Sequence, residues 1–292
     1  HAHIKKAVIG ISGGLDSTLA LLSTHSAFEI MNWNTSNIIA VTMPGFGTTS
    51  RTKSNAVKLC EALGVTLKTV DITELSLNEF EAIEHDKDEH SVTYENVQAR
   101  ARTSILMNMA NKEGGLVIGT GDLSEIALGW STYNGDHMSM YALNSGIPKT
   151  LIQYVIEYYK SNESIANIID DILDTPISPE LLPHESDEIV QETEAIVGPY
   201  ELHDFFLYHF IKYGANPTKI RFLAAKAFAS KYDEETITKW LKVFLRRFFT
   251  QQFKRSCMPD GPKVGTISLS PRADWKMASD ADVEIWLEEL DK

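Results

Sequence analysis

The chain has 292 residues, of which 43% are hydrophobic and 23% are charged, an ordinary balance for a globular protein. Its formal net charge of -13 argues against general affinity for nucleic acid, so local lysines and arginines must hold any anionic ligand. No apolar run approaches the roughly 20 residues that a membrane span needs. The two cysteines, Cys60 and Cys257, are too few for a disulfide framework or a metal knuckle. We therefore expect a cytoplasmic protein that binds neither nucleic acid nor membrane.

The first predicted elements are a strand and a helix joined by a glycine-rich turn. Residues 4–11 (IKKAVIGI) are a mainly apolar run typical of a buried strand, and residues 19–22 (LALL) predict the first turns of a helix. The turn between them, SGGLDST at residues 12–18, combines glycines that permit close approach of a ligand with hydroxyls beside free helix amides. This pattern favours a phosphate. Because the lysine of a Walker A loop is absent and Asp16 takes its place, we expect Mg²⁺ between Asp16 and the phosphate. The alternative is a glycine-rich turn in which Asp16 only caps the helix.

Strands and helices then alternate through the first half of the chain. Further strands are predicted at residues 37–43, 65–72 and 116–120, and helices at residues 54–63 and 93–112. This order predicts an α/β fold, a doubly wound parallel sheet with helices on both faces. The connection at residues 44–51 follows a strand, where ligands collect in such sheets.

The second half of the chain is predicted to be helical. Helices are expected at residues 154–160, 164–173, 201–213, 219–230 and 234–250, with prolines between them. We expect an α/β core at residues 1–150 and a mainly helical part of the same domain at residues 151–292. The basic, Pro- and Gly-containing segment 251–277 is a candidate lid over the phosphates; the alternative is an ordinary surface crossing.

A second acidic residue follows the last predicted strand. Glu125 lies in GTGDLSE, which leads from residues 116–120 into a short helix. The carboxyl ends of the strands carrying Asp16 and Glu125 are expected to be near each other, so the two carboxylates can share one cation. Taken alone, Glu125 is equally compatible with an ordinary glutamate in a first helical turn.

Several segments together resemble one enzyme family. SGGLDST has the pattern of the pyrophosphate loop of ATP pyrophosphatases. It is followed by YENVQARAR (residues 94–102), GTGDLSEIALGW (119–130), a Pro-Lys-Thr helix start (148–150) and FKRSCMPDGPKVG (253–265), in the order found in NAD synthetases. The later segments are similar to the synthetase portion of the glutamine-dependent form, which carries a glutaminase domain upstream. The chain begins with His1 rather than Met, so we expect that domain to be absent from it.

The resemblance implies a reaction. The nicotinate carboxylate of deamido-NAD attacks the α-phosphorus of ATP and pyrophosphate leaves; ammonia then displaces AMP from the acyl-adenylate. Lys149 and Lys254 would neutralise phosphate charge, and no side-chain nucleophile is required. The family also implies a homo-oligomer, with ammonia supplied by the glutaminase domain in a longer chain.

The resemblance assigns roles residue by residue. Asp16, Lys149 and Lys254 correspond to catalytic positions, and Asp16 and Glu125 to Mg²⁺ ligands. The ATP-binding positions are Ser12, Gly13, Gly14, Leu15, Asp16, Ser17, Thr18, Thr120, Lys149 and Ser178. The positions that bind deamido-NAD are Arg100, Tyr133 and Lys254, with Tyr133 able to stack on a ring.

Each assignment has a structural alternative. Arg100 is compatible with exposed ion pairs alone, Lys149 with the start of a solvated helix, and Lys254 with a surface charge run. Where the shorter ammonia-dependent enzymes carry a lysine and an aspartate for deamido-NAD, this chain has Tyr133 and Met140. Core or dimer packing is therefore an equally good interpretation of Tyr133.

Two other functions stay open at this point. One is another ATP pyrophosphatase, such as GMP synthetase or a tRNA-modifying ligase, although added basic surface is not evident. The other is a non-catalytic nucleotide-binding module on the same sheet architecture.

Overall fold

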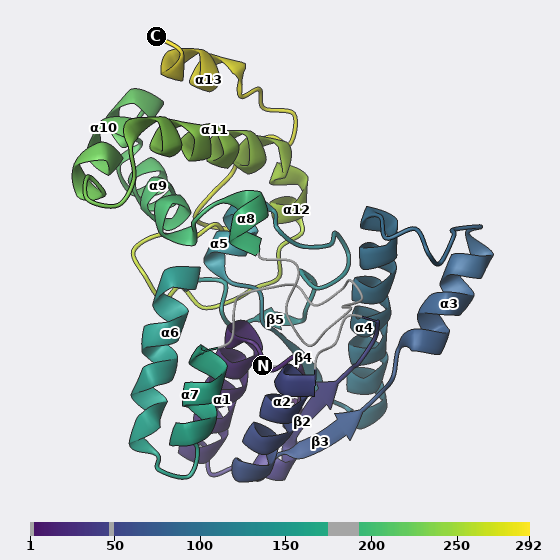
Figure 1. The fold of residues 1–292 in the computed structure, drawn as a ribbon. Coiled ribbons are helices and arrows are strands. Elements are labelled where there is room, and N and C mark those ends of the chain that lie inside the picture. Colours follow the sequence, from purple (N-terminus) through teal and green to yellow (C-terminus); the bar gives the residue numbers. More distant parts are fainter. Residues whose placement is uncertain (1–2, 47–49, 175–192) are drawn as a thin grey trace. The chain divides into compact units, whose positions relative to one another are not determined.

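The computed structural model describes residues 3–46, 50–174 and 193–292 (Figure 1). The chain forms two compact units, which are described separately. The sheet unit comprises His1–Gly121, Thr132–Asn144 and Ile152–Glu192. The helical unit comprises Asp122–Ser131, Ser145–Leu151 and Thr193–Lys292.

The sheet unit is built on five strands in the order β3-β2-β1-β4-β5. The strands are β1 (Ala7–Gly10), β2 (Ile38–Thr42), β3 (Thr66–Thr69), β4 (Leu116–Gly119) and β5 (Tyr141–Ala142). Every pairing is parallel, which confirms the predicted doubly wound α/β sheet. β1 lies between β2 and β4, so the turn that follows β1 leaves the sheet where the direction of strand winding reverses. Ligands collect at such a switch point in open parallel sheets.

Helices cover the sheet as right-handed crossovers require. The helices of this unit are α1 (Leu15–Ile30), α2 (Ser50–Ala62), α3 (Thr73–Ala82), α4 (Val92–Glu113), the larger part of α6 (Lys149–Tyr158) and α7 (Ala166–Leu173). The crossovers through α1 and α2 and the one through α4 run in opposite directions across the sheet, so they place their helices on opposite faces. On the α4 face, Val8, Ile39 and Val117 form a buried cluster against which Leu106 packs.

Helix α4 has clear signals at both ends. Ser91 is its N-cap and accepts a hydrogen bond from the Thr93 amide at 3.2 Å, and Gly114 closes it with a φ of +64°. Its last residue, Glu113, forms ion pairs with Lys6 at 3.0 Å and Lys68 at 2.7 Å. These two ammonium groups lower the pKa of Glu113 to about 2. α4 is thus tied to the residue before β1 and to β3.

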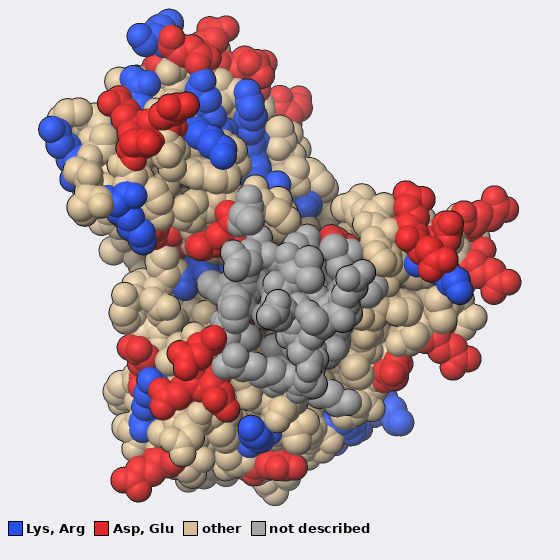
Figure 2. Space-filling view, viewed as in Figure 1, with Lys and Arg blue, Asp and Glu red and all other residues tan. Residues whose placement is uncertain are grey.

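The surface over α3 and the connection after it is acidic. Figure 2 shows red side chains gathered where Figure 1 labels α3. The exposed carboxylates of this segment include Glu74, Glu81, Glu84, Asp86, Asp88 and Glu89. This region therefore repels a polyanion such as nucleic acid.

The helical unit packs aromatic side chains from two long helices. Its elements are α5 (Leu123–Leu128), α8 (Thr193–Val197), α9 (Tyr200–Tyr213), α10 (Pro217–Ala227), α11 (Glu234–Thr250), α12 (Gln252–Ser256) and α13 (Glu284–Leu290). Phe206 and Phe210 of α9 pack on Phe244 of α11, with ring centroids 5.9 and 6.3 Å apart. Burying such rings supplies most of the free energy that holds a small helical unit together. None of the described helices is long and apolar enough to cross a bilayer.

The segment 251–277 contains α12 and then an irregular path. Leu269 is fully buried in it, and the ring of Trp275 packs 5.7 Å from Phe210 and 5.4 Å from Phe248. The segment is thus anchored on the aromatic core of the helical unit. Its role as a lid stays a prediction.

Candidate active site

The glycine-rich turn joins β1 to α1, as the sequence predicts. Gly13 has a φ of +93°, a conformation that side chains with a Cβ rarely adopt. The Ser12 hydroxyl accepts a hydrogen bond from the Gly14 amide at 3.2 Å, and the Ser17 hydroxyl donates to the Gly14 carbonyl at 3.1 Å. The two hydroxyl oxygens lie 3.2 Å apart. The turn is therefore held in shape by its own hydroxyls.

Asp16 does not cap α1. The N-cap is Gly14, which makes no side-chain capping bond, and Asp16 lies in the first turn of the helix. The interpretation of Asp16 as a simple helix cap is therefore wrong. A carboxylate in the first turn lies at the positive end of the helix dipole, which is a favourable place for negative charge.

Thr120, which follows β4, is joined to Asp16 through a third residue. The side-chain amide of Asn144 donates to the carbonyls of Asp16 and Thr120, both at 2.9 Å. Asn144 is fully buried. Its two hydrogen bonds therefore hold the turn after β1 close to the turn after β4.

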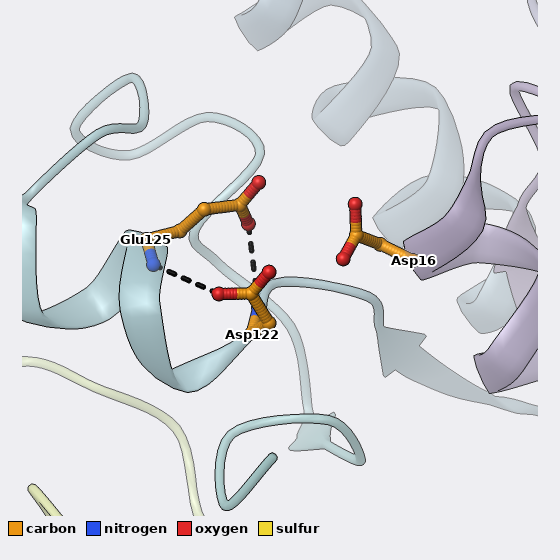
Figure 3. A group of neighbouring side chains, drawn as sticks. All are labelled: Asp16, Asp122 and Glu125. Atoms are coloured by element: carbon orange, nitrogen blue, oxygen red, sulfur yellow. Dashed lines mark hydrogen bonds between the residues drawn. The ribbon is translucent and has the colours of Figure 1, made fainter. Parts of the chain in front are cut away.

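Helix α5 begins with a capping box. Asp122 is the N-cap and accepts from the Glu125 amide at 2.8 Å, while Glu125 accepts from the Asp122 amide at 3.3 Å (Figure 3). Figure 3 also draws Asp16 on the first turn of α1. The box fixes both carboxylates of α5 in place. The spacing D-x-x-E in GDLSE signals it, so the sequence contained the information that places Asp122 beside Glu125.

Lys149 neutralises the two carboxylates of α5 in part. Its ammonium lies 2.7 Å from Asp122 Oδ2 and 2.8 Å from Glu125 Oε1. The Lys149 side chain is 2% exposed and that of Asp122 is fully buried. Lys149 begins α6, but the interpretation as a solvated helix start is wrong because the charge is buried. One ammonium against two carboxylates leaves this group with a net negative charge.

A buried aspartate connects α5, α6 and α9 within the helical unit. Asp204 of α9 accepts hydrogen bonds from the Ser124 hydroxyl, the Thr150 amide at 3.1 Å and the Thr150 hydroxyl at 2.7 Å. Ser124 Oγ in turn accepts from the Lys149 amide at 2.8 Å. Burial raises the pKa of Asp204, while these hydrogen bonds favour the charged form. Asp204 lies 80 residues from Ser124, and sequence reasoning missed it.

Three cations hold the other end of α5. Arg247 donates to the Leu128 carbonyl at 2.9 Å, and Lys254 donates to the carbonyls of Gly129 at 2.8 Å and Ser131 at 2.6 Å. Arg255 donates to the Ala127 carbonyl at 2.9 Å. Positive charge at the carbonyl end of a helix is favourable.

Of these cations, Arg255 is the most deeply buried. Its side chain is 1% exposed, and burial lowers its pKa to about 9, so it is still charged at neutral pH. Lys254 and Arg255 therefore do not form a solvated surface run. No pattern of neighbouring residues in the sequence indicates that the carbonyls of α5 are their partners.

Arg100 and Tyr133, both predicted to contact the dinucleotide, lie together in the sheet unit. The Arg100 guanidinium donates to the Tyr133 carbonyl at 3.3 Å, and the Tyr133 ring stacks on His137 with centroids 5.4 Å apart. Tyr133 is 44% exposed, so core packing does not account for its ring. Ser178 lies outside the described residues.

The structure thus groups the predicted site residues within each unit. In the sheet unit it brings the glycine-rich turn next to Thr120, and Arg100 next to Tyr133. In the helical unit it pairs Glu125 with Lys149 and places Lys254 at the far end of α5.

Comparison with known proteins identifies related sequences and structures. The family model for NAD synthase matches residues 1–244. The chain is 44% identical, over 98% of its length, to the glutamine-dependent NAD(+) synthetase of Mycobacterium leprae (strain TN), and equally to that of Mycobacterium tuberculosis (strain ATCC 25618 / H37Rv). It spans about half the length of these relatives, 46% in each case.

Solved structures share the fold. A glutamine-dependent NAD(+) synthetase from Cytophaga hutchinsonii matches with a TM-score of 0.79 at 18% identity, covering 100% of this chain and 53% of that one. The NMN synthetase from Francisella tularensis matches with a TM-score of 0.61 at 21% identity, covering 84% of this chain and 87% of that one. With the family model matching most of its length, the chain belongs to the NAD synthase family.

Proposed function

We propose that the chain catalyses the ATP-dependent amidation of deamido-NAD to NAD, releasing AMP and pyrophosphate. The observation that carries the proposal is the glycine-rich turn, which begins α1 without a side-chain cap at the switch point of the sheet. The 44% identity to named NAD(+) synthetases over nearly the whole chain supports the same reaction.

The proposed chemistry has two steps. An oxygen of the nicotinate carboxylate bonds to the α-phosphorus of ATP, the bond from that phosphorus to the β-phosphate oxygen breaks, and pyrophosphate leaves. Ammonia then bonds to the acyl carbon, AMP leaves with the carboxylate oxygen, and the nitrogen loses a proton to give the amide. The protein contributes position and charge rather than a covalent intermediate.

The phosphates of ATP belong, in this proposal, at residues 12–18 and Thr120. The hydroxyls of Ser12, Ser17 and Thr18 and the first amides of α1 are donors suited to phosphate oxygens. The Thr18 hydroxyl is buried and has no hydrogen-bond partner among the described residues. Lys149 adds a positive charge, and we retain Ser178 as a further ATP contact.

The donor set fits magnesium. Asp16, Asp122 and Glu125 offer carboxylate oxygens, the ligands that this hard cation prefers. Asp122 lies three residues after the end of β4, the strand next to β1, and Asn144 joins the carbonyls of Asp16 and Thr120. We propose that Asp16 and Glu125 hold Mg²⁺, with Asp122 as an additional ligand. When bound, the ion would stabilise negative charge on the departing pyrophosphate.

The dinucleotide is assigned to Arg100, Tyr133 and Lys254. The Arg100 guanidinium and the exposed Tyr133 ring offer charge and stacking area to an anionic, aromatic ligand. Lys254 is bonded to carbonyls at the end of α5, and a ligand there would share its ammonium. A homo-oligomer and a glutaminase domain in a longer protein are part of the same proposal.

The test supplies the chain with ATP, Mg²⁺, deamido-NAD and ammonium, and measures NAD with an alcohol dehydrogenase assay. NAD formation with ammonium but not with glutamine alone is expected. Equal use of glutamine would contradict the proposal that ammonia is supplied by a separate domain. A chain that binds ATP without releasing pyrophosphate would be a nucleotide-binding module.

Two further arms define the substrate. Nicotinate mononucleotide tests the activity named for the Francisella tularensis neighbour. Xanthosine monophosphate tests the activity of GMP synthetase. Deamido-NAD is expected to give the highest rate of pyrophosphate release. A higher rate with either mononucleotide would overturn the substrate assignment.

A further inference from the structure

We propose that Asn144 is a positioning residue for the reaction, because its carboxamide sets the spacing between the turn after β1 and the turn after β4. The inference rests on the proposed function for its effect on rate. We call the two hydrogen bonds of the Asn144 carboxamide the clamp. The clamp lies within the sheet unit, which contains Asn144, Asp16 and Thr120.

The carboxamide uses both of its N–H bonds. Asn144 Nδ2 donates to the Asp16 carbonyl and to the Thr120 carbonyl, each at 2.9 Å. Among side chains, only the amides of Asn and Gln place two coplanar neutral donors on one nitrogen. The two acceptors belong to chain segments that are 104 residues apart by their numbers, 16 and 120. Asn144 therefore joins two turns that do not share local structure.

The clamp joins the chain segments that follow β1 and β4, just beyond the last residues that these two strands pair. The register between β1 and β4 ends at Ile9 and Ile118, before either turn begins. Asn144 is carried there by β5, whose neighbour Leu143 donates its amide to the Gly119 carbonyl at 3.3 Å. A short strand thus delivers one fully buried side chain to the point where the two turns leave the sheet.

The side-chain oxygen of Asn144 shows that packing alone does not explain why an asparagine occupies this position. Asn144 Oδ1 is buried and has no hydrogen-bond partner among the described residues. A buried unpaired carbonyl is unfavourable, and an apolar side chain of similar size would avoid it. The residue type is explained by its two donors.

The consequence for the reaction is geometric. The turn at residues 12–18 is proposed to hold the phosphates, and the turn after β4 leads into Asp122 and Glu125. A shift of about 1 Å between such groups is enough to lower a rate on the order of a hundredfold, although each group still binds its own ligand. Asn144 should therefore affect kcat more than the KM for ATP.

The test compares Asn144→Ala and Asn144→Asp with the wild-type chain. Asn144→Asp keeps the shape but removes both donors and sets an oxygen against two carbonyls. The matched control is Asn55→Ala, since Asn55 is an equally buried asparagine of the same unit on α2. We expect both Asn144 variants to lower kcat for deamido-NAD-dependent pyrophosphate release at least tenfold, with the KM for ATP within threefold of wild type.

A second readout does not depend on activity. Amide hydrogen exchange is measured for the peptides covering residues 12–20 and 119–123, with α11 as an internal reference. Exchange at least fivefold faster in those two peptides, with α11 unchanged, is expected for Asn144→Ala. Unchanged exchange, or a kcat loss no greater than that of Asn55→Ala, would overturn the inference. An inactive wild-type chain whose Asn144→Ala variant still exchanges faster would instead overturn the proposed function.

Discussion

Replacing Arg255 with methionine tests how the end of α5 is held. The Arg255 guanidinium donates to the carbonyls of Ala127 at 2.9 Å, Ile126 at 3.4 Å and Phe248, and to Gln252 Oε1 at 3.0 Å. It also lies 4.1 Å from the centre of the Phe248 ring. Methionine keeps most of the apolar stem but provides no donor.

The expected loss of stability follows from the carbonyls left behind. Each buried carbonyl that loses its donor costs about 1–3 kcal/mol, and at least the Ala127 and Phe248 carbonyls lose theirs. Removing a buried charge returns part of this cost. We expect a net decrease of about 2–4 kcal/mol in the free energy of unfolding, which for a chain of this size lowers Tm by roughly 4–8 °C.

The measurement is urea unfolding followed by circular dichroism, with Tm from a thermal scan. The matched control is Arg246→Met, because Arg246 is an exposed arginine on the neighbouring helix α11 and should change stability by less than about 0.5 kcal/mol. Arg255→Lys should be intermediate, since one ammonium reaches fewer carbonyls. If Arg255→Met is as stable as the Arg246 control, the carbonyls of α5 do not depend on this side chain and the reasoning fails.

Three further predictions concern a buried histidine, a crowded glycine and the buried ion pair. Burial lowers the pKa of His203 to about 4, so this side chain takes up a proton at a higher pH in the unfolded chain than in the folded one. The free energy of unfolding should therefore fall by about 3 kcal/mol from pH 7 to pH 4. The His203→Phe variant should show a weaker pH dependence in urea unfolding. A pH dependence equal to that of wild type would contradict this. Gly129→Ala should cost more than Gly214→Ala, because both glycines have a positive φ but only at Gly129 would a Cβ lie 2.3 Å from another side chain; equal Tm values would refute the difference. Lys149→Met should destabilise the chain by about 3–5 kcal/mol because it strands the carboxylate of Asp122, and adding Asp122→Asn should recover part of that loss in the same assay; a double variant no more stable than the single one would refute the coupling.

Local signals explain which elements the sequence predicts well. Helix α11 is predicted at residues 234–250 and observed at Glu234–Thr250, because Asp233 caps it and its apolar residues repeat with helical spacing. The strand before the glycine-rich turn is predicted at residues 4–11 but observed at Ala7–Gly10, because the prediction included Lys5 and Lys6 on the strength of Ile4. β5 has two residues, too few for any pattern, and so escapes prediction.

The residues of the candidate site likewise differ in how well the sequence predicts them. The glycine-rich turn and Glu125 are visible in motifs of consecutive residues, and the capping aspartate Asp122 could have been found from its spacing to Glu125. Asn144 and Asp204 act on residues far away in the chain, and a single sequence contains no pattern that reveals such partners. Long-range polar contacts are specified by the fold and become readable only once the fold is known.

The ion pairs of Glu113 with Lys6 and Lys68 imply that the two ends of the sheet respond differently to solvent. These pairs are partly exposed, so salt screens them, and acid removes them as pH falls through about 2. A high salt concentration should therefore loosen the sheet unit first beside the amino end of β1. The carboxyl ends of the strands, where Asn144 is buried, should keep their structure until the whole sheet unit unfolds.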